Sequence, residues 1–217
     1  MIRIDQEKII TNKCKKLHLG AEENYLQDWI NTDIKPLSKK IYYMDATKPF
    51  PFKDESLDYV FSEHVIEHLS FDEGLFMLKE CHRVLKNGGK IRIATPDLSV
   101  FLGLGNDSLS ASQKKYINWI KKRFLLNISS NINIHVINNL FYNWGHKFIY
   151  NGPTLVNSLK KTGFHKIVRC QVGKSLDPNL NNIEQHGIHM NAPEANKFET
   201  MVFESTCCKK GGNKNEF

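Results

Sequence analysis

The chain has 217 residues, of which 41% are hydrophobic and 24% charged, so its length and composition suit one globular domain. The formal net charge is +7, but the lysines are spread along the chain and form no stripe of the kind that follows a nucleic-acid backbone. The five cysteines include no C-x-x-C pair, so neither a disulfide framework nor a zinc cluster is indicated. No apolar run approaches the roughly 20 residues of a membrane span, and no secretory signal precedes the domain, so we expect a cytoplasmic protein.

Seven short segments rich in β-branched or aromatic residues predict buried strands. In chain order they are residues 16–19, 29–32, 40–44, 58–62, 90–95, 166–172 and 201–205.

A helix is predicted between the fourth and fifth of these strands. Ser70 and Glu73 have the spacing of a capping box, and apolar residues then recur at helical spacing as far as Leu85. We expect residues 87–89, Asn-Gly-Gly, to end this helix. Strand, helix and strand joined by short connections form a βαβ unit, which requires a parallel sheet, so the predicted fold class is α/β. A second helix is predicted over residues 153–162.

Residues 103–150 interrupt this alternation with two helical patterns, at 110–126 and 133–144. A long insertion after a central strand usually has a functional role. We expect it to cover the carboxyl ends of the strands, where open α/β sheets bind ligands. The predicted organisation is one domain over residues 1–205, with this insertion as its cover, and a polar, disordered tail over 206–217.

Four residues near the ends of the first three strands suit a nucleoside ligand. Gly20 has no Cβ and lets the backbone approach a ligand closely. Asp33, thirteen residues later, can accept hydrogen bonds from ribose hydroxyls. Asp45 can accept one from an adenine amino group beside the small Ala46, although capping a turn is an equally good role for it. The absence of G-x-G-x-x-G argues against a nicotinamide dinucleotide.

More specific motifs lie in residues 45–98, which contain D-A, P-F, L-D, H-x-I-E-H and then R-x-L-K-x-G-G. This block closely resembles the class I S-adenosylmethionine-dependent methyltransferases, in particular the small group similar to methyltransferase type 11. The resemblance continues upstream in residues 16–34. It also continues downstream in the motif W-G-H-K-F-I-Y at 144–150 and in E-T-M-V-F-E at 199–204, and so covers almost the whole chain.

The resemblance implies a Rossmann-like, doubly wound, seven-stranded sheet that is mostly parallel, with an antiparallel last strand. It implies S-adenosylmethionine as the cofactor, bound at the ends of the first four strands. The family's usual first motif is G-x-G, and Glu22 stands here in place of the second glycine. The residues that the resemblance assigns to the cofactor are Gly20, Ala21, Asp33, Asp45, Ala46, Ser62 and Glu63.

Three residues are candidates for catalysis. His146, in W-G-H, is the leading candidate for a general base because an unperturbed histidine has a suitable pKa. His64 is expected to point toward the acceptor, and Asp97 follows the fifth strand, where it either takes part in catalysis or caps the next turn. His186 and His189 could reach the same opening.

His64, Glu67 and His68 also spell H-x-x-E-H, the inverted zinc-protease motif. That motif needs a helix, whereas here it lies between a strand and a helix start, so we predict no metal.

The predicted activity is in-line methyl transfer to an oxygen or nitrogen of a small molecule or glycan precursor. No nucleic-acid partner is expected from the scattered lysines. Residues 62–65 read S-E-H-V where enzymes of this class that methylate base amino groups commonly have (D/N)PP(Y/F), which argues against that activity though not against every RNA substrate. Two alternatives stay open: an RNA methyltransferase, and an S-adenosylmethionine-binding protein with weak or no catalysis. The sequence does not identify the acceptor or the oligomeric state.

Overall fold

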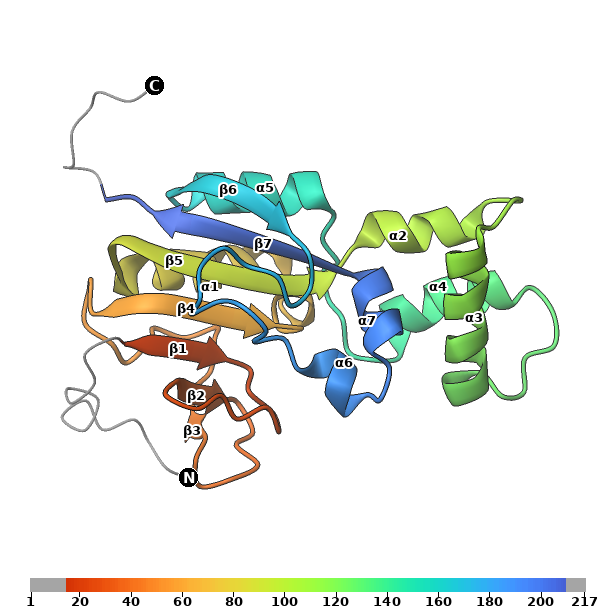
Figure 1. Cartoon of the computed structure of the whole chain (residues 1–217), viewed down its shortest axis with the longest axis horizontal. Coiled ribbons are helices and arrows are strands. Elements are labelled where there is room, and N and C mark those ends of the chain that lie inside the picture. Colours follow the sequence, from red (N-terminus) through yellow and green to blue (C-terminus); the bar gives the residue numbers. More distant parts are fainter. Residues whose placement is uncertain (1–14, 210–217) are drawn as a thin grey trace.

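A seven-stranded sheet forms the centre of the protein in the computed structural model, which describes residues 15–209. The strand order is β3-β2-β1-β4-β5-β7-β6 (Figure 1). The strands are β1 Lys16–Leu19, β2 Ile30–Asp33, β3 Tyr42–Tyr43, β4 Leu57–Glu63, β5 Leu85–Pro96, β6 Phe164–Cys170 and β7 Thr200–Cys207. β7 runs antiparallel to both of its neighbours, and the other pairs are parallel. The predicted α/β fold with an antiparallel last strand is confirmed.

The register of the central strands brings their carboxyl ends to one edge. Leu19 at the end of β1 lies opposite Thr32 of β2 and Ser62 of β4, and Glu63 of β4 lies opposite Ala94 of β5. The residues that follow these strands therefore emerge side by side, as parallel strands require.

Two helices cover one face of the sheet: α1 (Phe71–Val84) and α5 (Gly152–Lys161). Both predicted helices are thus present. The capping box of α1 is confirmed, because the Ser70 side chain accepts from the Glu73 amide and the Glu73 carboxylate accepts from the Ser70 amide. These helices contribute Leu78 and Leu159 to a core that also contains the apolar residues of β1, β4 and β5.

The expected end of α1 at residues 87–89 is wrong. The helix ends at Val84, and β5 begins immediately at Leu85. β5 advances from Leu85 to Lys90 while the neighbouring β4 advances only from Leu57 to Tyr59, so the Asn-Gly-Gly segment forms a bulge inside β5. The glycine pattern was a strand irregularity and not a helix stop.

The opposite face near Phe61 is covered by the connection between β6 and β7, which crosses in front of the sheet in Figure 1. Leu180 and Ile183 of this connection pack against Phe61 together with Trp29. Within the described chain, the connections that join β1 to β2 to β3 contain no helix, and they are too short for a crossover helix.

The insertion lies beyond the carboxyl ends of the strands (Figure 1). Its two predicted helices are confirmed as α3 (Ala111–Phe124) and α4 (Ile132–Tyr142), preceded by α2 (Leu98–Leu102) and a 3-10 turn, η3 (Gly103–Gly105). They share a second apolar cluster with Phe198, which belongs to α7. The remaining elements are η2 (Ile66–His68), α6 (His186–His189) and α7 (Pro193–Glu199). The cover is therefore built from two separate segments of the chain.

β7 continues two residues past residue 205, where the sequence predicts the end of the domain. Thr206 pairs with Lys90, and Cys207 pairs with Phe164 and is buried, so both belong to β7. The rest of the predicted tail, from residue 210 on, lies outside the described residues.

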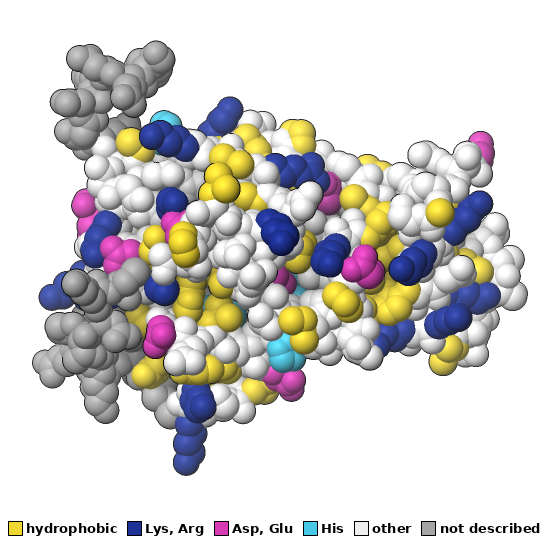
Figure 2. Space-filling view, viewed as in Figure 1, with side chains coloured by type: hydrophobic (Ala, Val, Ile, Leu, Met, Phe, Trp, Pro, Cys, Tyr) yellow, Lys and Arg dark blue, Asp and Glu magenta, His cyan; other side chains and the backbone are white. Residues whose placement is uncertain are grey.

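Two surface features bear on partners. Within residues 15–209, none of the helices combines the length and the apolar character that crossing a membrane requires. Figure 2 shows lysine and arginine side chains scattered over the visible face among hydrophobic and acidic ones, without one continuous basic patch.

Candidate functional site

A pocket of about 320 Å³ lies where the strands end and the insertion begins. Gly20 and Glu63 reach it from the ends of β1 and β4, and aromatic residues of the insertion, Trp119 and Trp144, form part of its wall. The titratable residues that line it are Glu22, Glu63, His64, His68, His146, His186 and Glu199.

Gly20 is required by a close approach between two loops. Its φ is +67°, and a Cβ at this position would lie 2.2 Å from Cγ2 of Val65, in the loop after β4. Glu22 also has a positive φ, +42°, which is uncommon for a residue with a side chain. The turn therefore keeps a glycine-like backbone although Glu22 replaces the family's second glycine.

Asp33 holds this turn to the next one. Its Oδ2 accepts a hydrogen bond of 2.9 Å from the Glu22 amide, and its Oδ1 accepts one of 2.7 Å from the Lys35 amide. Asp45 caps its own turn, because its Oδ1 accepts from both the amide and the hydroxyl of Thr47.

The predicted site residues divide into two groups. Those that line the pocket are Gly20, Glu63, His64 and His146. Those that do not line it are Ala21, Asp33, Asp45, Ala46, Ser62 and Asp97.

Asp97 performs the capping role that the sequence left open. Its Oδ1 accepts from the Ser99 amide at the start of α2, and its Oδ2 lies 2.7 Å from Nη2 of Arg169. Because Asp97 is buried, paired and absent from the pocket wall, its role in catalysis is not supported by this geometry.

One side-chain oxygen of Glu63 accepts hydrogen bonds and the other does not. Oε2 accepts from the amides of Gln185 and His186, at 2.8 and 3.2 Å. Oε1 is buried and has no hydrogen-bond partner among the described residues. Burial raises the pKa of Glu63 to about 7, although the nearby charge of His64 and the two amides oppose this.

His64 and Glu67 form a buried ion pair beside it. Nδ1 of His64 lies 3.0 Å from Oε1 of Glu67, whose Oε2 accepts from the Thr95 hydroxyl. Burial disfavours the charge on His64, but the hydrogen bond and charge of Glu67 outweigh it and raise the pKa of His64 to about 9. His64 is therefore a cation at neutral pH and not a general base.

His186 stacks on His64, with ring centroids 4.1 Å apart. Burial, together with the charge of His64, lowers the pKa of His186 to about 3, so its ring is neutral.

His146 has the features of a base. Its Nδ1 lies 2.7 Å from the Leu140 carbonyl oxygen, so Nδ1–H donates and Nε2 carries the free lone pair of the neutral ring. Burial lowers the pKa of His146, which keeps the ring neutral near pH 7.

The H-x-x-E-H motif forms no helix. Residues Ile66–His68 make a single 3-10 turn, and His64 and His68 fall into different groups of metal-ligating side chains. The zinc-protease arrangement is thus absent from the described structure.

Sequence reasoning missed Glu199 and Asn196, which α7 brings to the pocket. Glu199 is nine-tenths buried and accepts a hydrogen bond from the Tyr116 hydroxyl of the insertion. Burial raises the pKa of Glu199. No local pattern marks these residues, because their place depends on how the connection from β6 folds back over the sheet.

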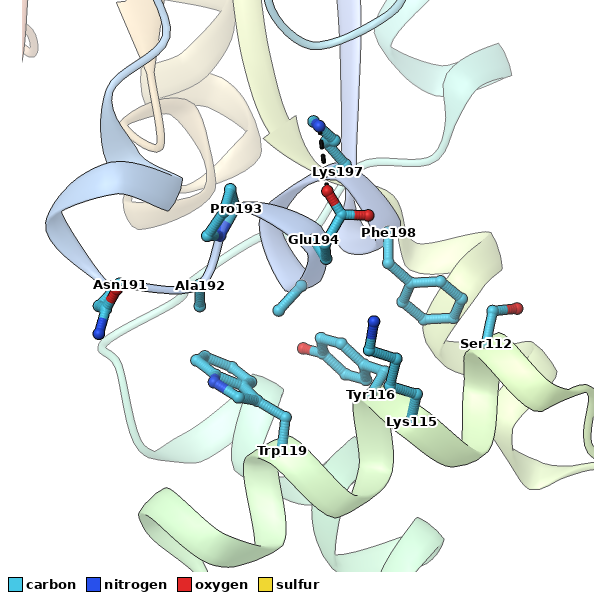
Figure 3. Close-up of a pocket in the computed structure, with 11 residues that line it drawn as sticks. Ser112, Lys115, Tyr116, Trp119, Asn191, Ala192, Pro193, Glu194, Lys197 and Phe198 are labelled. Atoms are coloured by element: carbon cyan, nitrogen blue, oxygen red, sulfur yellow. Dashed lines mark hydrogen bonds and ion pairs between the residues drawn. The ribbon is translucent and has the colours of Figure 1, made fainter.

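A second pocket of about 510 Å³ adjoins the first between α3 and α7 (Figure 3). The two pockets share Trp119 and Ala192. The rings of Trp119, Tyr116 and Phe198 lie along its wall in Figure 3, so it offers an apolar space next to the histidines. Lys115 also lines it.

Comparison with known proteins supports the resemblance. Residues 21–93 match the family model described as a methyltransferase domain. No curated protein matches the chain. A solved structure from Thermotoga maritima, described as an S-adenosylmethionine-dependent methyltransferase and possible histamine N-methyltransferase, is 18% identical, with a TM-score of 0.51 over 93% of this chain and 86% of that one. An S-adenosylmethionine-dependent methyltransferase from Archaeoglobus fulgidus is 17% identical, with a TM-score of 0.52 over 89% and 86% of the two chains.

At these identities the structural likeness concerns the fold, and the domain match concerns the strands and turns around the first pocket. Residues 21–93 thus match the methyltransferase domain family, and the described chain shares the Rossmann-like fold of these two S-adenosylmethionine-dependent methyltransferases.

Proposed function

We propose that this protein transfers the methyl group of S-adenosylmethionine to an oxygen or nitrogen of a small molecule or glycan precursor. One observation carries the proposal: a neutral histidine with a free Nε2, His146, lines a pocket that also contains Gly20 at the end of β1.

The residues present fit the cofactor. The unpartnered Oε1 of Glu63 belongs to a buried carboxyl group, whose ionised form would suit the positive sulfonium or ammonium group of S-adenosylmethionine. Each oxygen of Asp33 accepts one amide hydrogen bond and keeps a second lone pair, so it can still accept from a ribose hydroxyl. Gly20 would lie along the methionine part of the cofactor, and Asp45 and Ala46 beside its adenine.

When bound, S-adenosylmethionine supplies a methyl group already activated by the sulfonium. The chain then has to align the acceptor, exclude water and remove a proton. Nε2 of His146 would take the acceptor's proton, and a positioned base of this kind contributes roughly 10²–10⁴-fold in rate. Trp119 and Trp144 would exclude water, and the adjoining apolar pocket would hold the part of the acceptor that does not react.

His146→Asn tests the base. The asparagine amide can still donate to the Leu140 carbonyl, but the variant lacks the lone pair of Nε2. We expect transfer from methyl-labelled S-adenosylmethionine to an extract of metabolites and glycan precursors to fall by about 100-fold or more, with unchanged cofactor affinity by calorimetry. His135→Asn, at an exposed position of α4, is the matched control. Equal turnover in both variants would exclude His146 as the base.

A second candidate, a cofactor-binding protein without turnover, is favoured by Glu22, which lines the pocket at the family's glycine position. The two functions differ in one experiment. A cofactor at 100 times its Kd adds about 2.7 kcal/mol of stability. Thermal stabilisation without label transfer to any extract would favour the second candidate.

A further inference from the structure

We propose that the first pocket binds a divalent first-row transition metal ion through His64, His186 and Glu199. The three residues come from the loop after β4, from α6 and from the last turn of α7. Each offers one ligand atom, and these atoms lie within 4.8 Å of one another. The site shares its pocket with the methyl transfer proposed above, but binding of the ion does not require that activity.

The donor set suits such an ion. Two imidazoles and one carboxylate are the protein ligands of several catalytic zinc sites and of non-haem iron sites. Three protein ligands leave a coordination position for water or for an acceptor oxygen.

His64 is oriented as metal-binding histidines are. Its Nδ1 is held by the Glu67 carboxylate at 3.0 Å, and Glu67 is itself fixed by the Thr95 hydroxyl. Nε2 therefore faces α7, where it lies 3.2 Å from both Oδ1 of Asn196 and Oγ1 of Thr200. A carboxylate on the outer nitrogen of a ligand histidine is the usual arrangement around bound metal ions.

Glu199 is held in a similar way. The Tyr116 hydroxyl donates to its Oε2, and Oε1 accepts no hydrogen bond from the described residues. A buried carboxylate with one fixed and one free oxygen is prepared for a single metal–oxygen bond.

The charges around the pocket call for a cation. Glu63, Glu67 and Glu199 are 5%, 0% and 9% exposed, and none of the described residues that line the pocket is a lysine or arginine. His64 already pairs with Glu67, so Glu63 and Glu199 are the two of these buried carboxyl groups that lack an ion-pair partner among the described residues, and a bound cation would compensate their charge.

A neighbouring group, Glu67, His68 and His146, is a weaker candidate. Both oxygens of Glu67 already have partners, Thr95 and His64, so coordination there would break the His64–Glu67 pair. Coordination by His64, His186 and Glu199 keeps that pair. It requires the stacked ring of His186 to turn, because ligand atoms around a tetrahedral zinc ion lie only about 3.4 Å apart.

The test is metal binding by the full chain after treatment with a chelator. We expect one Zn²⁺ per chain by calorimetry, and a visible absorption band of tetrahedral Co²⁺ that Zn²⁺ abolishes. Glu199→Gln, which keeps an acceptor for Tyr116, and His186→Ala should each weaken Zn²⁺ binding by at least 100-fold. Glu67→Gln should weaken it by about 10–100-fold.

His189→Ala is the matched control, since His189 is exposed on the same helix and belongs to neither ligand group. It should bind Zn²⁺ as the unmodified chain does. Circular dichroism and thermal unfolding establish that each variant is folded. No saturable Zn²⁺ or Co²⁺ binding by the unmodified chain, or equal binding in the Glu199 and His189 variants, would overturn the proposal. S-adenosylmethionine affinity, measured in chelator, reports separately on the proposed methyl transfer.

Discussion

The contact between Gly20 and Val65 can be measured as a stability difference. In Gly20→Ala the new Cβ would lie 2.2 Å from Val65 Cγ2, and the Cβ and Cγ1 atoms of the same valine are at 3.5 and 3.7 Å. Valine is stiff about χ1, so rotation brings another methyl group toward the same space. Overpacking of this kind costs about 1–3 kcal/mol, and the left-handed φ of +67° adds about 1–2 kcal/mol for a residue with a Cβ.

Gly88→Ala separates the two contributions. Gly88 also has a positive φ, +82°, but a Cβ there would meet nothing within 4 Å, so only the backbone cost of about 1–2 kcal/mol applies. In urea unfolding we expect Gly20→Ala to lose about 2–5 kcal/mol and to lower Tm by about 10 °C. Val65→Ala on the Gly20→Ala background should restore the steric part. Equal losses in the two glycine variants would refute the reasoning.

Three further outcomes can be checked with the same methods. Arg92→Met leaves Glu184 and Glu204 without their shared buried cation and should cost about 3–5 kcal/mol in urea unfolding; a loss below 1 kcal/mol would contradict this. Burial lowers the pKa of His18 to about 4, so the unfolded chain takes up a proton near pH 6.5 and the folded chain does not. The stability contribution of His18 is thus present above pH 6.5 and lost as the pH falls from 6.5 to 4. His18→Leu should therefore reduce the change in unfolding free energy with pH over this range, measured by urea unfolding at each pH. The free energy of unfolding of Glu22→Gly should lie within about 1 kcal/mol of that of the unmodified chain, because relief of the positive φ and the added entropy of the unfolded chain nearly cancel. This variant should bind the cofactor at least as tightly as the unmodified chain. Weaker binding by calorimetry would assign Glu22 a favourable contact.

The strands and α1 could be predicted because their signals are local. The capping box at Ser70 and the apolar stripe of α1 act within one helix, and short β-branched runs form strands, although β6, at the edge of the sheet, is mostly exposed and not buried as predicted. The antiparallel direction of β7 was expected only from the family resemblance that the motifs of residues 45–98 carry, because the spacing of the strands along the chain does not indicate their direction. The bulge at residues 87–89 was missed because it depends on pairing with β4, which the glycine pattern does not encode.

The candidate site was only partly predictable for the same reason. Gly20, Glu63, His64 and His146 lie close to motifs and do reach the pocket, but Glu199 and Asn196 reach it only because α7 packs against the insertion. Asp97 was ambiguous in the sequence, since a residue after a strand can face a ligand or cap a helix. The partner that decided its role, Arg169, is far away in the chain.

In the turn from Gly20 to Glu22, the two positions of the glycine motif meet different requirements: the first must lack a side chain, and the second must have a positive φ. Gly20 cannot carry a side chain because Val65 occupies its place. Glu22 adopts a positive φ despite its side chain, because its amide is bonded to Asp33. The turn therefore has a glycine-like backbone at position 22, and Glu22 joins Glu63 and Glu199 among the residues that line the pocket. Glutamate in place of glycine thus adds negative charge at the pocket, and the cofactor affinity of Glu22→Gly measures the effect of that charge on binding.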